Sequence, residues 1–130
     1  MRIAAVRREK AGRRKRGEAV VVAVLSRQDL EKLDLRVATI LEAERVKDTD
    51  RLLRLKVRLG GEERQIVAGI GGDYGPEDLP GRRIVMVANL KPAVIRGVES
   101  RGMLLAAAEG KKSVLVGPCS EVPDGTRVTL

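Results

Sequence analysis

The sequence predicts an all-β protein built around a small antiparallel barrel. Three observations lead to this class. Apolar and charged residues alternate with a period of two in LLRLKVRL at 52–59, glycine and proline interrupt the chain at short intervals, and helical spacing is confined to short segments. With 130 residues, of which 43% are hydrophobic, the chain is long enough to bury one core.

The predicted elements begin with a short helix, because Ser26 is placed to cap a helix at about 27–33 in SRQDLEKL. We then expect strands at 34–46, 52–59, 64–70, 82–90 and 102–107, with shorter ones at 113–117 and 127–130. Gly60 and Gly61 supply a hairpin turn, and Pro76 suits the first turn of a second short helix. A five-stranded OB-type barrel with short helices and a C-terminal β extension fits this strand count best, and a β-sandwich is the alternative.

The composition argues against an enzyme. The chain has no His and a single cysteine, Cys119, so it lacks the usual general base, the Ser–His and Cys–His pairs, a disulfide and a Cys-rich zinc site. Carboxylate pairs such as Asp48 and Asp50 have Lys and Arg neighbours, which is more typical of solvated ion pairs than of acid–base dyads. We expect no cofactor, no metal and no catalysis.

Charge divides the chain into parts. The net charge is +8, and residues 1–17 hold eight Lys or Arg against one Glu, while the rest holds 18 basic and 17 acidic residues. We expect a flexible basic arm at 1–17, an apolar connecting segment at 18–26 that adds an edge strand or packs as a ribbon, and a folded domain at 27–130. From Arg82 to Lys112 seven basic residues face two acids, which favours a polyanionic partner.

Nothing in the chain indicates a membrane segment or a secretory signal. No apolar run approaches 18 residues, and AVVVAVL at 19–25 is short for a signal core and is followed by Ser26 and Arg27 rather than by a cleavage site. We therefore expect a cytoplasmic protein that does not contact the membrane.

The stretch VANLKPAVIRGVESRGMLL at 87–105 combines apolar residues with two glycines and with polar residues that include Asn89, Lys91, Arg96, Ser100 and Arg101. A core segment does not need this many polar side chains, and a solvated loop does not need this many apolar ones. We expect the apolar positions to close the barrel, the polar ones to lie on its rim, and Gly97 and Gly102 to permit close approach of the backbone.

The scarcity of aromatic residues limits the kind of nucleic acid that this chain can bind. Its only aromatic residue is Tyr74, whereas barrels that bind single strands by stacking present several aromatic rings. Cations and polar groups without rings suit phosphate and ribose contacts on a folded RNA instead.

Five segments together resemble the structure-independent tRNA-binding domain, a family with an OB fold. They are DLRVATILEAERV, DRLLRLKV, GGEERQIVAGI, YGPEDLPGRRIVMVANLKP and RGVESRGMLLAA, and they cover roughly residues 27–130 in the order of the family. The family includes the C-terminal module of methionyl-tRNA synthetases and free-standing bacterial tRNA-binding proteins. The resemblance implies binding of folded tRNA by shape, without catalysis. Val46-Lys47 and Ala68 depart from the common residues of the family, which weakens any carry-over to the first loop.

The resemblance also implies a set of binding residues. Its members are Arg36, Asn89, Lys91, Arg96, Ser100 and Met103, to which Arg101 adds a cation of this chain. Asn89 and Ser100 have an alternative role, which is to satisfy backbone groups at a strand end.

The resemblance implies partners as well. They are tRNA, a methionyl-tRNA synthetase that the domain would serve, and a second copy of this chain, because family members of this kind form homodimers. A chaperone-like relative of the same fold that binds unfolded polypeptides is the second hypothesis. No synthetase catalytic core fits in 130 residues, so we do not expect aminoacylation by this chain.

Overall fold

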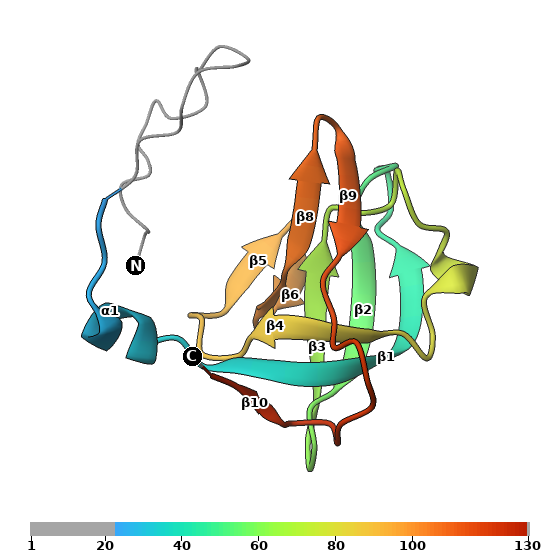
Figure 1. Cartoon of the computed structure of the whole chain (residues 1–130). Coiled ribbons are helices and arrows are strands. Elements are labelled where there is room, and N and C mark those ends of the chain that lie inside the picture. The colour runs from blue at the N-terminus through green and yellow to red at the C-terminus, as the bar shows by residue number, and fades with distance from the viewer. Residues whose placement is uncertain (1–22, 130) are drawn as a thin grey trace. The chain divides into compact units, whose positions relative to one another are not determined.

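The computed structural model describes residues 23–129, and the chain divides into two compact units, Met1–Lys32 and Leu33–Leu130 (Figure 1). The basic arm predicted at 1–17 lies outside the described residues, as does most of the apolar segment predicted at 18–26. Residues 23–25 of that segment form neither a helix nor a strand. Within the described part of the chain, no helix is long and apolar enough to cross a membrane.

The first unit contains the predicted short helix, α1, at Arg27–Glu31. Ser26 is its N-cap, and the Ser26 hydroxyl accepts the Asp29 backbone N–H at 3.1 Å. The Asp29 carboxylate in turn accepts the Ser26 N–H at 3.1 Å, which completes a capping box. The cap prediction is therefore confirmed, although the helix is two residues shorter than expected.

The second unit is a nearly closed antiparallel barrel, as predicted. Its main sheet has the order β3-β2-β1-β4-β7, and β10 also pairs with β1. The strands are β1 at Leu35–Arg45, β2 at Leu53–Arg58, β3 at Glu63–Ala68, β4 at Arg83–Val87, β7 at Met103–Leu104 and β10 at Arg127–Val128. The two end strands, β3 and β7, contact each other, which brings the sheet round to closure.

Strand β1 is long enough to belong to both halves of the barrel. Its first part, from Leu35 to Thr39, pairs with β4, and its later part, from Thr39 to Arg45, pairs with β2. The edge that β2 leaves open at Leu35 and Arg36 is covered by β10. This cover protects backbone groups that would otherwise be open to edge-to-edge pairing.

The core fills the barrel interior with aliphatic side chains. The predicted alternation in β2 is confirmed, since Leu53, Leu55 and Val57 are fully buried while the residues between them are at least partly exposed. The largest fully buried side chains are Ile40, Leu53, Leu55, Ile66, Leu79, Ile84, Met86 and Val57. A single core of this kind is what one small barrel can bury.

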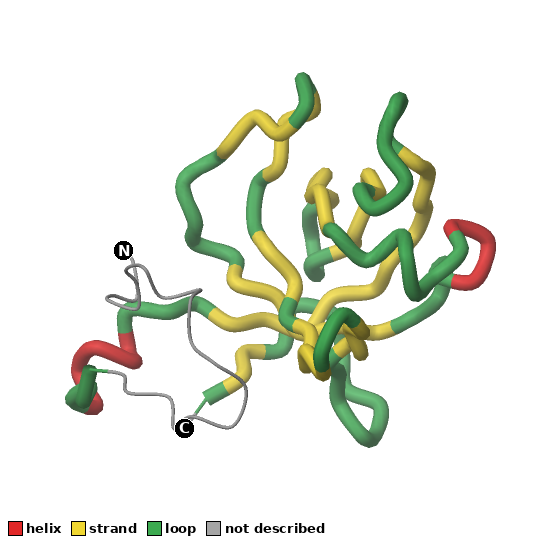
Figure 2. The backbone as a smooth tube through the Cα atoms, turned by 90° about the horizontal axis from the view of Figure 1, so that it is seen from above, coloured by secondary structure: helices red, strands yellow, loops and turns green. Residues whose placement is uncertain are grey.

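Three further elements lie outside the main sheet. The helical turn predicted at Pro76 is η3, Pro76–Asp78, and it lies at the periphery of this unit (Figure 1, Figure 2). Strands β5 (Ala93–Ile95) and β6 (Val98–Ser100) form one hairpin, and β8 (Ala106–Glu109) and β9 (Lys112–Leu115) form another.

The fifth predicted strand, at 102–107, is divided in the structure. Met103 and Leu104 pair with β4 in the barrel, whereas Ala106 begins the hairpin with β9. Leu105 marks the break, because its N–H donates to the Val85 carbonyl while its own carbonyl accepts the Val116 N–H. The run GMLLAA is apolar throughout, so the sequence does not indicate that its two halves pair with different strands.

Candidate nucleic-acid interface

The segment between β4 and β7, residues 88–102, contains a hairpin of β5 and β6 that sequence analysis did not predict. Its two strands are joined by Arg96 and Gly97, which have φ angles of 53° and 81°. A two-residue turn with positive φ at both positions matches the twist of the flanking strands. The sequence signal was available, since AVI and VES flank a dipeptide that ends in glycine.

The two glycines of this segment have different functions. A Cβ added at Gly102 would lie 2.6 Å from the Met86 methyl carbon and 3.0 Å from the Val87 carbonyl oxygen, so close approach requires glycine there, as predicted. At Gly97 an added Cβ would meet nothing within 4 Å. No described part of the protein approaches Gly97 in this way; its positive φ serves the turn, and close approach of a partner there stays a prediction.

Ser100 lies inside the barrel wall and closes it. The residue is 4% exposed, and its hydroxyl accepts the Val67 backbone N–H at 3.0 Å while donating to the Gly102 carbonyl at 3.1 Å. Next to it, the Arg101 N–H donates to the Gln65 carbonyl at 2.9 Å. The Ser100 hydroxyl thus takes the place of a backbone acceptor where β3 meets the end of β6.

Asn89 has a comparable bond at the start of β1. Its side-chain oxygen accepts the Asp34 N–H at 2.9 Å, beside the bond from the Ala88 N–H to the Asp34 carbonyl at 2.7 Å. For Asn89 and Ser100, the structure therefore shows the bonds of the alternative role, which is to satisfy backbone groups at a strand end.

Arg36 is also engaged within the protein. Its Nε donates to the Asp34 carboxylate at 2.7 Å and its Nη1 to the Gly125 carbonyl at 3.1 Å, and the Asp34 contact raises the pKa of Arg36. Arg127 lies 3.8 Å from the same carboxylate. These contacts tie the start of β1 to the C-terminal segment that includes β10.

The remaining predicted binding residues are on the surface of this segment. Lys91, Arg96 and Arg101 are exposed, and none of the three side chains makes an ion pair or hydrogen bond within the part of the chain that the structure describes. Met103 is 52% exposed on β7. The structure therefore exposes three cations that form no ion pair with a described residue, together with one thioether on the adjoining strand, although Arg101 is near enough to Glu62 to help lower the pKa of that carboxyl.

Not all apolar residues of the segment close the barrel, contrary to the sequence prediction. Val87 and Leu104 are buried, but Val94 is 72% and Leu90 is 38% exposed. The reason is that Val94 lies on a two-stranded hairpin, which has one face on the barrel and one face in solvent.

Two residues of β3 that sequence analysis missed hold this segment in place. The Arg64 side chain is only 16% exposed, and its Nη1 donates to the Ala88 carbonyl at 2.5 Å and to the Arg101 carbonyl at 3.4 Å. The Gln65 amide donates to the Glu99 carbonyl at 2.9 Å. No sequence signal distinguishes Arg64 from the other cations in strands, because only the fold places the two ends of the segment, at Ala88 and Arg101, beside it.

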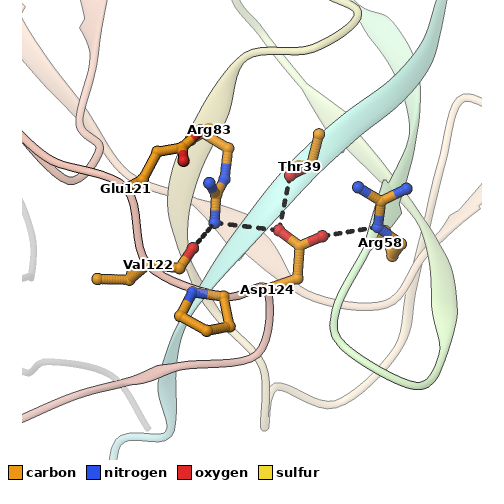
Figure 3. Close-up of a pocket in the computed structure, with 7 residues that line it drawn as sticks. Thr39, Arg58, Arg83, Glu121, Val122 and Asp124 are labelled. Atoms are coloured by element: carbon orange, nitrogen blue, oxygen red, sulfur yellow. Dashed lines mark hydrogen bonds and ion pairs between the residues drawn. The ribbon is translucent and has the colours of Figure 1, made fainter.

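A second polar cluster joins the C-terminal segment to the barrel (Figure 3). The Asp124 carboxylate accepts bonds of 2.6 Å from the Thr39 hydroxyl and 2.6 Å from Arg58 Nε, and Arg83 Nη2 lies 3.3 Å from it. Arg83 also donates to the Val122 carbonyl. Partial burial acts to raise the pKa of Asp124, but the hydrogen bonds from Thr39 and Arg58 outweigh it and lower that pKa.

The described residues contain no group of three or more side chains that could hold a metal ion. The polar clusters of the barrel bind its own strands and segments together. What the surface segment offers is cations, backbone groups and exposed apolar side chains, which suit binding rather than bond-making chemistry.

The family model described as "Putative tRNA binding domain" matches residues 35–127. This chain belongs to that family. The match runs from the start of β1 into β10, so it covers the whole barrel, including the segment that carries Lys91, Arg96 and Arg101.

Curated relatives similar to this chain include methionine–tRNA ligases. The chain is 52% identical over 104 residues to the enzyme of Archaeoglobus fulgidus, which covers 80% of this chain but 16% of that protein. It is 62% identical over 93 residues to the enzyme of Methanothrix thermoacetophila, covering 72% of this chain and 14% of that protein. The chain therefore spans about one sixth of the length of these relatives.

Solved structures of similar size have the same fold. A MetRS-related protein from Pyrococcus horikoshii is 39% identical with a TM-score of 0.77, covering 82% of this chain and 99% of its own. The chaperone CsaA from Bacillus anthracis is 34% identical with a TM-score of 0.76, covering 82% of this chain and 100% of its own. Membership of the tRNA-binding domain family is therefore supported by structure as well as by sequence.

Proposed function

We propose that this domain binds folded tRNA without catalysis, through the surface of residues 88–104. The observation that carries the proposal is that Lys91, Arg96 and Arg101 lie exposed on one segment and that none of the three forms an ion pair with a described residue, although the charge of Arg101 acts on Glu62. Cations that form no ion pair, in and beside a positioned hairpin, can neutralise phosphates without first losing an ion pair within the protein.

Folded RNA fits this surface better than a splayed single strand. Stacking of unpaired bases needs aromatic side chains, and the only aromatic residue, Tyr74, is engaged elsewhere. Its hydroxyl oxygen accepts the Leu115 N–H at 3.1 Å, and its ring lies under the Arg82 guanidinium at 5.3 Å. Backbone contacts on a fixed RNA shape need no such rings.

The predicted binding residues then divide into two groups. Lys91, Arg96, Arg101 and Met103 face the RNA, whereas Asn89, Ser100 and Arg36 act through the bonds that hold the barrel and the segment in shape. The backbone of the segment remains available for contacts with ribose and phosphate.

A competition mobility-shift measurement tests the function. It compares folded tRNA with a duplex of equal length and with an unfolded polypeptide. We expect tRNA to displace the duplex from the domain, and we expect the polypeptide not to displace tRNA. A polypeptide that displaces tRNA with higher affinity would instead support the second candidate, a chaperone-like function. The exposed Leu90, Val94 and Met103, together with the likeness to CsaA, favour that candidate.

We also propose that the domain serves a methionyl-tRNA synthetase and forms a homodimer. The service to a synthetase is supported by the match of this chain to one part of a methionine–tRNA ligase. The homodimer is supported by two exposed apolar side chains, Val114 in β9 and Val116 after it. Light scattering that shows a monomer at micromolar concentration contradicts the dimer. The service to a synthetase is tested by measuring the tRNA affinity of the methionyl-tRNA synthetase from the same cell with and without this domain. An unchanged affinity contradicts it.

A further inference from the structure

The outward face of β1, β2 and β3 carries cations that are neutralised, in contrast to the surface of residues 88–104. Lys56 Nζ lies 3.8 Å from Glu42 and 3.9 Å from Glu63, and Arg54 forms an ion pair with Glu44. This is the strand face on which OB barrels commonly bind oligonucleotides. We call it the β1–β3 face, made up of Glu42, Glu44, Arg54, Lys56, Glu63 and Gln65.

A β-bulge produces this arrangement of charges. Ile40 pairs with Val57 and Glu42 pairs with Lys56, so Leu41 is an extra residue without a partner in β2. Because strand residues alternate between faces, this one insertion turns Glu42 and Glu44 outward, directly opposite Lys56 and Arg54. Without it, Leu41 would lie opposite Lys56 and both acids would point into the core.

The β1–β3 face adjoins the proposed RNA surface. Gln65 is opposite Lys56 in the β2–β3 register, and its amide donates to the Glu99 carbonyl in β6. Neighbouring strands are about 4.8 Å apart. Glu42 and Glu44 in β1 are therefore two strands away from Gln65, and Glu63 is in the same strand as Gln65. That spacing is comparable to the screening length of about 8 Å at physiological salt, so a strand that extended from β6 onto β3 and β2 would come within reach of their charge.

We propose that Glu42, Glu44 and Glu63 are specificity determinants that keep single-stranded RNA off the β1–β3 face. The inference rests on the proposed function and deepens it, because it names the RNA class that the domain rejects. A single strand that lay across β2 and β3 would have to separate Arg54 and Lys56 from their carboxylates and would find no aromatic ring there. A folded tRNA that contacts only the surface of residues 88–104 meets no such obstacle.

The test is the triple variant E42Q/E44Q/E63Q, which keeps side-chain size and frees Arg54 and Lys56. We expect its affinity for a single-stranded uridine oligomer to rise several-fold. The slope of log affinity on log salt should steepen by about 0.7 for each phosphate newly contacted. Affinity for folded tRNA should rise less, so the ratio between the two RNAs falls.

The matched control is E77Q/D78N/E109Q, which changes the net charge equally at exposed acids away from this face. We expect only a small, equal gain for both RNAs from its charge. If the control raises oligomer affinity as much as the triple variant, or if the triple variant binds the oligomer like the wild type, the proposal is wrong. The proposed function is tested separately with the K91A/R96A variant, in which unchanged tRNA binding would contradict it. The oligomer measurement reports on the β1–β3 face and not on the surface of residues 88–104.

Discussion

The Val67 N–H donates to the Ser100 hydroxyl, at 3.0 Å, where the sheet closes into a barrel. A side-chain hydroxyl thus accepts the hydrogen bond that a backbone carbonyl would accept in a regular ladder between β3 and the end of β6. Both groups are buried, since Val67 is 5% and Ser100 is 4% exposed, so water cannot replace the bond at low cost.

Ser100→Ala should therefore act on stability first. It leaves the buried Val67 N–H without its acceptor, which costs about 1–3 kcal/mol of the free energy of unfolding. Chemical denaturation measures that change, and the salt slope of tRNA binding should stay that of the wild type. If the variant kept full stability but lost tRNA affinity, Ser100 would contact the RNA directly.

The three unpaired cations should each contribute to the salt dependence of tRNA binding. Replacement of Lys91, Arg96 or Arg101 by Ala should lower the slope of log affinity on log salt by up to about 0.9, without lowering the melting temperature. Lys112→Ala, an exposed cation on β9, is the control and should leave the slope unchanged. Unchanged slopes in Lys91→Ala and Arg96→Ala would place the RNA elsewhere on the barrel.

Gly102→Ala should be strongly destabilising. Gly102 has a φ of 129°, and an added Cβ would clash with Met86 and with the Val87 carbonyl, so we expect a loss above about 1 kcal/mol in unfolding free energy. Gly61→Ala is the control, because an added Cβ there meets nothing within 4 Å and φ is not positive. Equal stability of the two variants would contradict the close approach at Gly102.

The Asp124 cluster predicts a pH dependence of stability. The pKa of Asp124 is lowered in the folded state, so the carboxylate contributes stability above its unfolded pKa of about 4, and this contribution is lost as pH falls through the folded pKa. Asp124→Asn should be less stable than the wild type at neutral pH, and the difference should shrink below about pH 4. Urea denaturation across that range measures it, and a difference that stays constant with pH would contradict the assignment.

Deletion of residues 1–17 should weaken binding to tRNA and to an RNA duplex alike. These residues carry eight basic side chains, which neutralise phosphates without reading shape or sequence. Fluorescence titration of both RNAs at two salt concentrations measures the effect. Loss of the preference for tRNA in the truncated protein would show that the arm has a specific role.

By itself, the sequence determined those features that depend on residues close together in the chain. The alternation in β2, the hairpin turn at Gly60 and the cap at Ser26 follow from spacing over a few residues, and the structure confirms them. The absence of His excluded several catalytic arrangements before any fold was known, and the concentration of cations after Arg82 indicated a polyanionic partner. Local periodicity and composition carry this information because they need no knowledge of which strands become neighbours.

The tertiary structure decided which polar groups are bonded within the protein. In the sequence Ser100, Asn89 and Arg36 are polar residues like Lys91 and Arg96. In the structure they bond to Val67, Asp34 and Gly125, which are between 33 and 89 residues away. The pairing of Glu42 with Lys56 likewise depends on one bulged residue in β1. Barrel closure buries distant backbone groups side by side, and buried backbone groups need hydrogen-bond partners, so only the closed barrel separates the cations bonded within the fold from those that form no bond there.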